Sequence, residues 1–275
     1  MQCENNECLY RSPWRRLLQR RHNEGVFLQG RWYCSLDCFE QGITPVFDQL
    51  MSLPDEPLPQ QHRLPLGLIL LGRGAINEDQ LKIALQAQRN KGGERLGRWL
   101  IRLGVVSDQE ITAALAAQWG CAVFPLENHH SYRDCSHLLP LALLESARMV
   151  PLHYLPANHW LYVGFAEDID RTTVYSIERL LSSRTEACVV SETAMKEAMD
   201  EIRGMSHPAE IVFETVWSAG QMARTIRDYA LKLGAEELLL ARPRRFLWVR
   251  LKAGGRPLDL MFRMPPVRFA AGEAS

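Results

Sequence analysis

Residues 66–88, LGLILLGRGAINEDQLKIALQAQ, and residues 96–118, LGRWLIRLGVVSDQEITAALAAQ, are two copies of one pattern. A shift of thirty residues superposes the landmarks, which are Leu66 on Leu96, Gly67 on Gly97, Gly74 on Gly104, Leu85 on Leu115, and Gln88 on Gln118. A solenoid needs at least about three units to bury a continuous core. We therefore expect the pair to fold as one compact unit with approximate two-fold symmetry.

Each copy predicts a short helix, a glycine stop and a second, capped helix. The apolar stripe of the short helix in the second copy recurs at helical spacing and consists of Leu96, Trp99, Leu100 and Leu103. Gly104 follows, where the end of a helix favours a left-handed residue. The run Ser107-Asp108-Gln109-Glu110 is a capping box that begins the second helix. Asn77 and Gln80 hold the same two positions in the first copy.

A glutamine, Gln88 or Gln118, ends the buried stripe of each second helix. A buried amide must find hydrogen-bond partners. In one interpretation each glutamine caps a neighbouring backbone group. In the other, the two matched glutamines face a ligand that has two matched halves. The sequence leaves both interpretations open.

The repeated pattern resembles the MshEN-type N-terminal domain of type II secretion and type IV pilus assembly ATPases, with about residues 66–202 covered. The resemblance implies a tandem domain that in some members binds cyclic di-GMP, a two-fold symmetric dinucleotide. The positions that it implies as ligand contacts are Arg95, Leu96, Gly97 and Gln118, with degenerate counterparts at Leu66, Gly67 and Gln88. Where the first copy should have an arginine it has Pro65, and Arg63 lies two residues too early. A lost charge-assisted contact is worth about 1.5–3 kcal/mol, so nucleotide binding is expected to be weak or absent while the fold survives.

The chain as a whole predicts an α+β protein with several parts. Residues 63–127 form the tandem subdomain, and residues 128–203 form a small α/β subdomain of the same domain, preceded by a short buried strand over 121–126. Residues 209–263 predict a C-terminal α/β unit with one helix and three strands, and residues 264–275 predict a disordered tail.

Cys3, Cys8, Cys34 and Cys38 form two close pairs near the N-terminus. In a reducing compartment this arrangement is typical of a tetrathiolate zinc site, and the alternative is two pairs of free thiols. A metal with four thiolate ligands has no open position for water, so the zinc is expected to be structural. The run from Trp32 to Phe39 resembles FCS and TRASH-type treble-clef fingers, whose first cysteine pair is usually closer than Cys3 and Cys8. This departure leaves room for His22 as a substitute ligand. We expect a zinc module over 1–48 and an extended linker over 49–62.

Basic and aromatic residues lie between the two cysteine pairs, namely Tyr10, Arg11, Trp14, Arg15, Arg16, Arg20, Arg21 and Arg31. Such a cluster can bind nucleic acid, and it can equally be the solvated face of a finger or a dock for an acidic partner. The chain has 32 basic and 32 acidic residues, which favours the solvated face.

Motifs for catalysis are missing from the sequence. It has no G-x-x-x-x-G-K-[ST] loop for an ATP phosphate, and no G-x-S-x-G or H-E-x-x-H motif. His129 and His130 fit a polar loop better than a metal site. We therefore predict no enzyme and no catalytic residues.

The expected function is that of a non-catalytic regulatory or adaptor protein. It would bind a protein partner, such as secretion or pilus machinery, or cyclic di-GMP; the alternative is a zinc-finger nucleic-acid-binding regulator. The sequence has no apolar run long enough to cross a bilayer and no signal peptide. We therefore expect a cytoplasmic protein without membrane insertion, whose seven cysteines are reduced.

Overall fold

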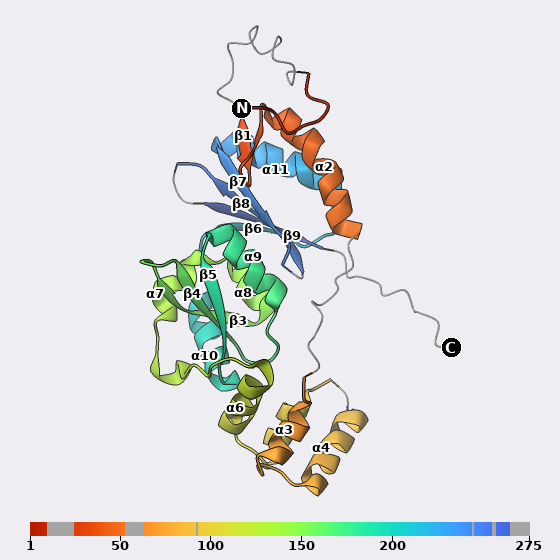
Figure 1. Cartoon of the computed structure of the whole chain (residues 1–275), viewed down its shortest axis with the longest axis vertical. Helices are drawn as coiled ribbons and strands as arrows, with labels where there is room; N and C mark the ends of the chain where they lie inside the picture. Colours follow the sequence, from red (N-terminus) through yellow and green to blue (C-terminus); the bar gives the residue numbers. More distant parts are fainter. Residues whose placement is uncertain (10–24, 53–62, 92, 244, 255–256, 265–275) are drawn as a thin grey trace, which may run out of the picture.

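The computed structural model describes residues 1–9, 25–52, 63–91, 93–243, 245–254 and 257–264. These residues form a mixed α+β protein with ten α-helices and two sheets. Figure 1 shows three parts stacked along the long axis: a helical part, a part with a three-stranded sheet, and a part with a six-stranded sheet. Outside the described residues lie His22, most of the arginines between the cysteine pairs, and nearly all of the predicted tail.

The helical part contains the two sequence copies. Its helices are α3 (Leu66–Gly72), α4 (Glu78–Lys91), α5 (Leu96–Arg102) and α6 (Asp108–Trp119). The predicted stops are confirmed, because Gly74 and Gly104 have φ values of +68° and +66°. The predicted capping box is confirmed as well: the Ser107 Oγ accepts from the Glu110 N–H, and the Glu110 carboxylate accepts from the Ser107 N–H.

The two copies pack reciprocally, so that α3 contacts α6 and α4 contacts α5. A Cβ atom on Gly67 would lie 2.8 Å from Leu81 of its own copy and 3.3 Å from Leu96 of the other copy. A Cβ on Gly97 would lie 3.2 Å from Ile111 of its own copy and 3.4 Å from Leu66 of the other. These four neighbours are equivalent under the shift of thirty residues. The helical part therefore has the approximate two-fold symmetry that the sequence predicts.

The middle part is a three-stranded sheet with helices around it. Its elements are η1 (Leu126–Asn128), α7 (Tyr132–Cys135), η2 (Ser136–Leu138), α8 (Leu141–Ala147), β3 (Met149–Leu155), β4 (Trp160–Phe165), α9 (Arg171–Leu181), β5 (Arg184–Val189) and α10 (Glu192–Arg203). The sheet order is β3-β4-β5, with β3 and β4 antiparallel and β4 and β5 parallel.

The prediction of a buried strand over residues 121–126 is wrong. Only an isolated bridge between Val123 and Val189 forms there, and Val123 is 47% exposed. Pro125 lacks a backbone N–H for a ladder, and a 3₁₀ turn begins directly after it.

The third part combines the two ends of the described chain. Its elements are β1 (Val26–Leu28), β2 (Arg31–Tyr33), α2 (Leu36–Ser52), β6 (Ala209–Phe213), α11 (Ala219–Leu233), β7 (Glu237–Ala241), β8 (Phe246–Lys252) and β9 (Leu258–Arg263). The sheet order is β2-β1-β7-β8-β9-β6. The N-terminal hairpin joins the C-terminal strands because β1 pairs in parallel with β7, with Phe27 opposite Glu237 and Leu28 opposite Leu238.

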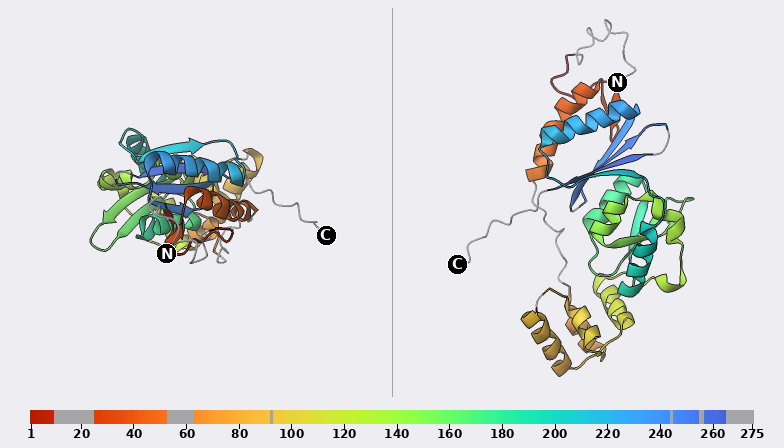
Figure 2. Two further views of the ribbon diagram at one scale, coloured as in Figure 1. Left: turned by 90° about the horizontal axis from the view of Figure 1, so that it is seen from above. Right: turned by 180° about the vertical axis from the view of Figure 1, so that it is seen from behind.

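The sequence analysis predicts two separate units over residues 1–48 and 209–263. In the structure the two segments share one sheet and one core. Helices α2 and α11 pack on each other over one face of this sheet (Figure 2). Helix α2 continues to Ser52, so the first residues of the expected linker are helical. Strand β6 was not predicted, and it forms the far edge by pairing in parallel with β9. A hairpin of two three-residue strands cannot bury an apolar face alone, and the larger sheet supplies the missing partner.

Both faces of the six-stranded sheet are covered. Leu238 and Leu240 of β7 pack in the core beneath α2 and α11, whereas Leu239 and Ala241 pack in the core of the middle part. This alternation is that of a strand with two buried faces. Asp259, which is fully buried, accepts two hydrogen bonds from Arg250, and Arg250 also donates to the Leu138 carbonyl of the middle part.

No helix in the described ranges is both long and apolar enough to cross a bilayer.

Candidate functional site

Arg95 begins the second copy as the N-cap of α5. Its guanidinium lies 2.7 Å from the Asp168 carboxylate and 3.4 Å from the Glu167 carboxylate, both in the loop after β4. The hydrogen bond with Asp168 raises the pKa of Arg95. The arginine that the resemblance implies as a ligand contact therefore pairs here with the middle part of the protein.

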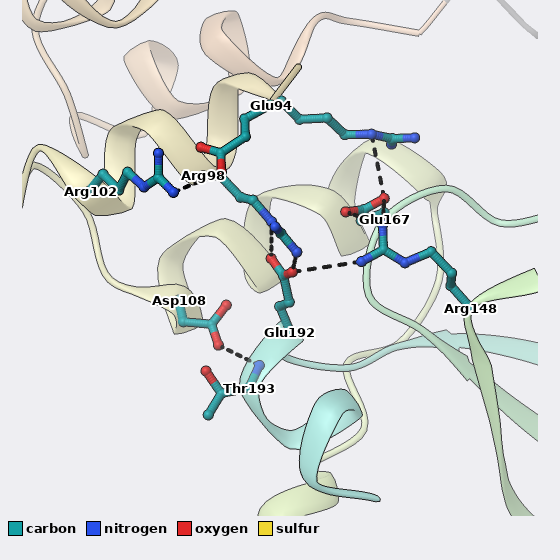
Figure 3. A network of polar contacts seen from close by, with 9 residues as sticks. Glu94, Arg98, Arg102, Asp108, Arg148, Glu167, Glu192 and Thr193 are labelled. Atoms are coloured by element: carbon teal, nitrogen blue, oxygen red, sulfur yellow. Dashed lines mark hydrogen bonds and ion pairs between the residues drawn. The ribbon is translucent and has the colours of Figure 1, made fainter. Parts of the chain in front are cut away.

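Arg95 belongs to a larger ionic network between the second copy and the middle part (Figure 3). Arg98 forms a bidentate pair with Glu192 at the start of α10. Arg148 joins this pair to the loop, because its guanidinium lies 2.9 Å from Glu167 and 3.8 Å from Glu192. Figure 3 also shows Asp108, whose carboxylate accepts from the Thr193 N–H at 3.2 Å. The first copy has Pro65, Leu68 and Glu78 at the places of Arg95, Arg98 and Asp108.

The two glutamines occupy equivalent positions. The Gln88 amide donates to the Glu94 carbonyl at 3.0 Å, and the Gln118 amide donates to the Leu64 carbonyl at 2.7 Å. Each acceptor directly precedes the N-cap residue of the other copy. In this structure both glutamines thus cap a backbone group, as the first of the two interpretations expects.

The structure brings four of the seven implied ligand positions together. Leu66, Gly67, Leu96 and Gly97 meet where α3 crosses α5. Gln88 and Gln118 lie at the two junctions between the copies, and Arg95 lies at the boundary with the middle part. Sequence reasoning missed the acidic partners of Arg95 and Arg98, which are Asp168 and Glu167 for Arg95 and Glu192 for Arg98.

The four N-terminal cysteines form the second candidate site. Their sulfur atoms all lie within 4.8 Å of one another, and none forms a disulfide. The Cys34 sulfur is 3.5 Å from that of Cys8 and 3.6 Å from that of Cys38. Zinc–sulfur bonds of about 2.3 Å in a tetrahedron place the sulfurs roughly 3.8 Å apart. The four residues therefore fit a tetrathiolate metal site.

Local structure holds these cysteines in place. Cys34 follows the β1–β2 hairpin, and Cys38 lies in the first turn of α2, where its N–H donates to the Ser35 Oγ at 3.1 Å. Burial raises the pKa of Cys34, and the neighbouring thiols add to the effect. Burial also opposes ionisation of Cys3, but hydrogen bonds from the backbone of Cys34 and Asn5 lower its pKa. A cation among the sulfurs would favour the thiolate form of all four.

Comparisons with known proteins identify relatives of part of the chain. No protein-family model matches the sequence. The type IV pilus assembly ATPase PilB of Myxococcus xanthus (strain DK1622) is 26% identical over 144 residues, which cover 52% of this chain and 25% of that protein. The resemblance to the MshEN-type domain is thereby confirmed.

A second relative has a different name. Bacteriophage adsorption protein B of Escherichia coli (strain K12) is 33% identical over 132 residues, which cover 46% of this chain and 16% of that protein. The chain thus spans a quarter or less of the length of these curated relatives. About half of the chain is therefore similar to proteins whose names describe different roles.

Solved structures give similarities of the same extent. The structure of MshE with cdg has 28% sequence identity and a TM-score of 0.44, and covers 51% of this chain and 99% of that chain. The N-terminal domain of XpsE has 17% identity and a TM-score of 0.37, and covers 49% of this chain and 91% of that chain.

Proposed function

We propose that this protein is a non-catalytic regulatory or adaptor protein, and that its MshEN-type domain binds a two-fold symmetric dinucleotide of the cyclic di-GMP class. The observation that carries the proposal is the reciprocal packing of the two copies. It places Leu66 and Gly67 opposite Leu96 and Gly97 in equivalent surroundings. Two equivalent halves of a site match a ligand with two equivalent halves.

Ligand binding has a specific cost in this chain. Arg95 already pairs with Asp168 and Glu167, so a ligand phosphate would compete with these carboxylates for its guanidinium. The first copy offers Pro65 at the equivalent position, so a single arginine serves both halves. We therefore propose a weaker affinity than that of a domain with both arginines, by about the 1.5–3 kcal/mol of one charge-assisted hydrogen bond.

Calorimetric titration of the full chain with cyclic di-GMP tests the proposal. Binding heat should saturate, and it should be strongly reduced in Arg95→Ala and in Gln118→Ala. Arg73→Ala is the matched control, because it removes an exposed arginine of the first copy that no proposed contact uses. Absence of heat, or equal heat in all four proteins, would contradict dinucleotide binding and leave a protein partner as the ligand of this domain.

We also propose that Cys3, Cys8, Cys34 and Cys38 hold one structural Zn²⁺. The metal would tie the N-terminal residues to the hairpin and to α2, and so to the six-stranded sheet. Metal analysis of the purified protein should find about one zinc per chain in the wild type and in the control Cys121→Ser. The double variant Cys34→Ser/Cys38→Ser should lack the metal and lose the hairpin contacts of β1 with β7. A double variant that retains zinc would contradict this assignment.

A protein partner completes the proposal. The relation to a pilus assembly ATPase makes components of secretion or pilus machinery the first candidates. Capture with the wild type and with a form lacking residues 63–118 would test whether the tandem copies form the docking surface. A partner that binds both forms equally would contradict this role of the copies.

A further inference from the structure

A cavity of about 240 Å³ lies between the end of α6, helix α9 and strand β5. It is separate from the crossing of α3 and α5 and from the cysteine cluster. Its lining includes Trp119, Cys121, Arg171, Glu178, Thr185 and Glu186. A cavity at a boundary between two parts of a chain is a common location for a small-molecule site.

Two buried polar atoms in the cavity wall lack hydrogen-bond partners among the described residues. They are the Nε1 of Trp119 and the Oγ1 of Thr185, and the Thr185 residue is 6% exposed. An unpaired buried donor or hydroxyl costs about 1–3 kcal/mol, so such atoms are normally paired. The indole N–H can only donate, and the hydroxyl can donate as well. The indole N–H therefore requires an acceptor, and an acceptor in the cavity would also satisfy the hydroxyl.

Two arginines beside the cavity also lack carboxylate partners. The Arg63 guanidinium stacks 3.5 Å above the Trp119 ring, and Arg171 lies at the exposed start of α9. Within the described residues neither has an acid at ion-pairing distance, whereas Arg95, Arg98 and Arg148 are all paired. Burial, and then the neighbouring charge of Arg171, lower the pKa of Arg63, while the charge of Asp168 acts against them. The two unpaired cations therefore lie close enough to repel each other.

The acids in the cavity wall are already engaged. Glu178 accepts from the Thr185 N–H at 2.9 Å, and Glu186 lies 3.6 Å from Arg184. Burial raises the pKa of the Cys121 thiol, and the charges of Arg171 and Arg63 act against it. Both positive charges thus act on the Cys121 side of the cavity, where Asp168 partly offsets the charge of Arg63.

We propose that this cavity binds a small phosphate-bearing anion. Arg63 and Arg171 would supply the charge, and the Trp119 indole and the Thr185 hydroxyl would donate hydrogen bonds. A phosphate group has up to two negative charges and at least three acceptor oxygens, which match two unpaired cations and two further donors. A carboxylate has one charge and two oxygens and matches them less well. The cavity is larger than a phosphate ion, so a phosphate ester fits it.

The test follows the indole N–H of Trp119 in nitrogen-15-labelled full-length protein. Each tryptophan gives one indole signal, and the signal that disappears in Trp119→Phe is that of Trp119. Titration with inorganic phosphate at constant ionic strength should shift this signal to saturation. In the same titration, acetate should bind more weakly than phosphate.

Variants separate a built site from general charge attraction. Arg171→Gln should weaken phosphate binding about tenfold, as the loss of one charge-assisted contact implies. Thr185→Val keeps the side-chain shape and should weaken it by a smaller factor. Arg73→Gln removes an exposed charge elsewhere and should leave the titration unchanged. A shift that never saturates, that is equal in Arg171→Gln and Arg73→Gln, or that acetate produces equally well would overturn the proposal.

Discussion

The two copies of the helical pair have one backbone pattern and two different surfaces. Both have a glycine at the helix crossing, a left-handed glycine stop and a capped second helix. The second copy docks on the middle part through Arg95, Arg98 and Asp108. At two of the equivalent positions the first copy has Pro65 and Leu68, and Leu68 is 52% exposed.

This difference shows which residues make the fold and which make the connections. The shared positions are buried or conformationally demanding, and they maintain the symmetry of the pair. The unshared positions lie on the outside, where charge attaches one copy to its neighbour and leaves the other copy open to solvent. Four predictions follow from the comparison, in order of decreasing effect.

The largest effect is expected in the shared core. Leu70 and Leu100 are equivalent and fully buried, so Leu70→Ala and Leu100→Ala should each cost about 2–5 kcal/mol. The losses should be similar because both leucines belong to one core. Hydrogen exchange of amides in α4 and α6 would measure the local unfolding free energy. A large loss in only one variant would show that the copies do not share a core.

The second prediction concerns the missing arginine. Pro65 has φ −55° and ψ 141°, close to the −79° and 157° of Arg95, so an arginine fits there without strain. If the dinucleotide binds as proposed, Pro65→Arg should tighten cyclic di-GMP binding by about 1.5–3 kcal/mol, roughly tenfold or more. Pro65→Ala is the control and should not tighten it. Equal affinities of both variants, measured by calorimetry, would argue against an arginine contact in the first half of the site.

The third prediction concerns the connection of the second copy. A double-mutant cycle with Arg98→Leu and Glu192→Gln should give a coupling of about 0.2–1 kcal/mol, since both side chains are partly exposed and screened. The coupling should fall as salt is added. Leu68→Arg in the first copy should show no coupling with Glu192→Gln. A zero coupling for the Arg98 pair at low salt would show that the network does not hold the copy in place.

The smallest effect is expected at the caps. Hydrogen bonds from the Ser107 backbone and side chain lower the pKa of Glu110, so its contribution is present above the ordinary glutamate pKa and is lost as the pH falls through the lowered value. The first copy uses Asn77 and Gln80, which do not titrate. An NMR titration should therefore show more loosening at the start of α6 than at the start of α4 at acidic pH. Glu110→Gln should remove the difference, and identical behaviour of both helices in the wild type would refute it.

Local sequence signals predicted most of the helices and strands correctly. The capping box at Ser107 and the glycine stops act over one turn of helix, so their consequences can be read from a few residues. The strand expected over 121–126 failed because Pro125 and a 3₁₀ turn interrupt an apolar run. Strand β6 was missed because an edge strand with partly exposed side chains lacks a clear alternation.

The candidate sites were predictable in part. Cysteine spacing identified four thiols that the structure brings within 4.8 Å of one another. The repeat identified Leu66, Leu96 and the two glycines, which meet at the crossing of α3 and α5. The partners of Arg95 could not be predicted, because Asp168 lies in another part of the chain and its pairing depends on how the two parts dock.

The amino-acid sequence by itself determined the paired helices, their symmetry and the grouping of the cysteines, since each depends on spacing within a short stretch. Only the tertiary structure decided that residues 27–28 pair with residues 237–238. It also decided that ion pairs attach the second copy to the middle part, while the equivalent surface of the first copy faces solvent. Such contacts depend on which apolar faces are left uncovered after the local elements form. That outcome is a property of the whole chain, because a sheet face or a charge is satisfied by the nearest partner in space and not by the nearest in sequence.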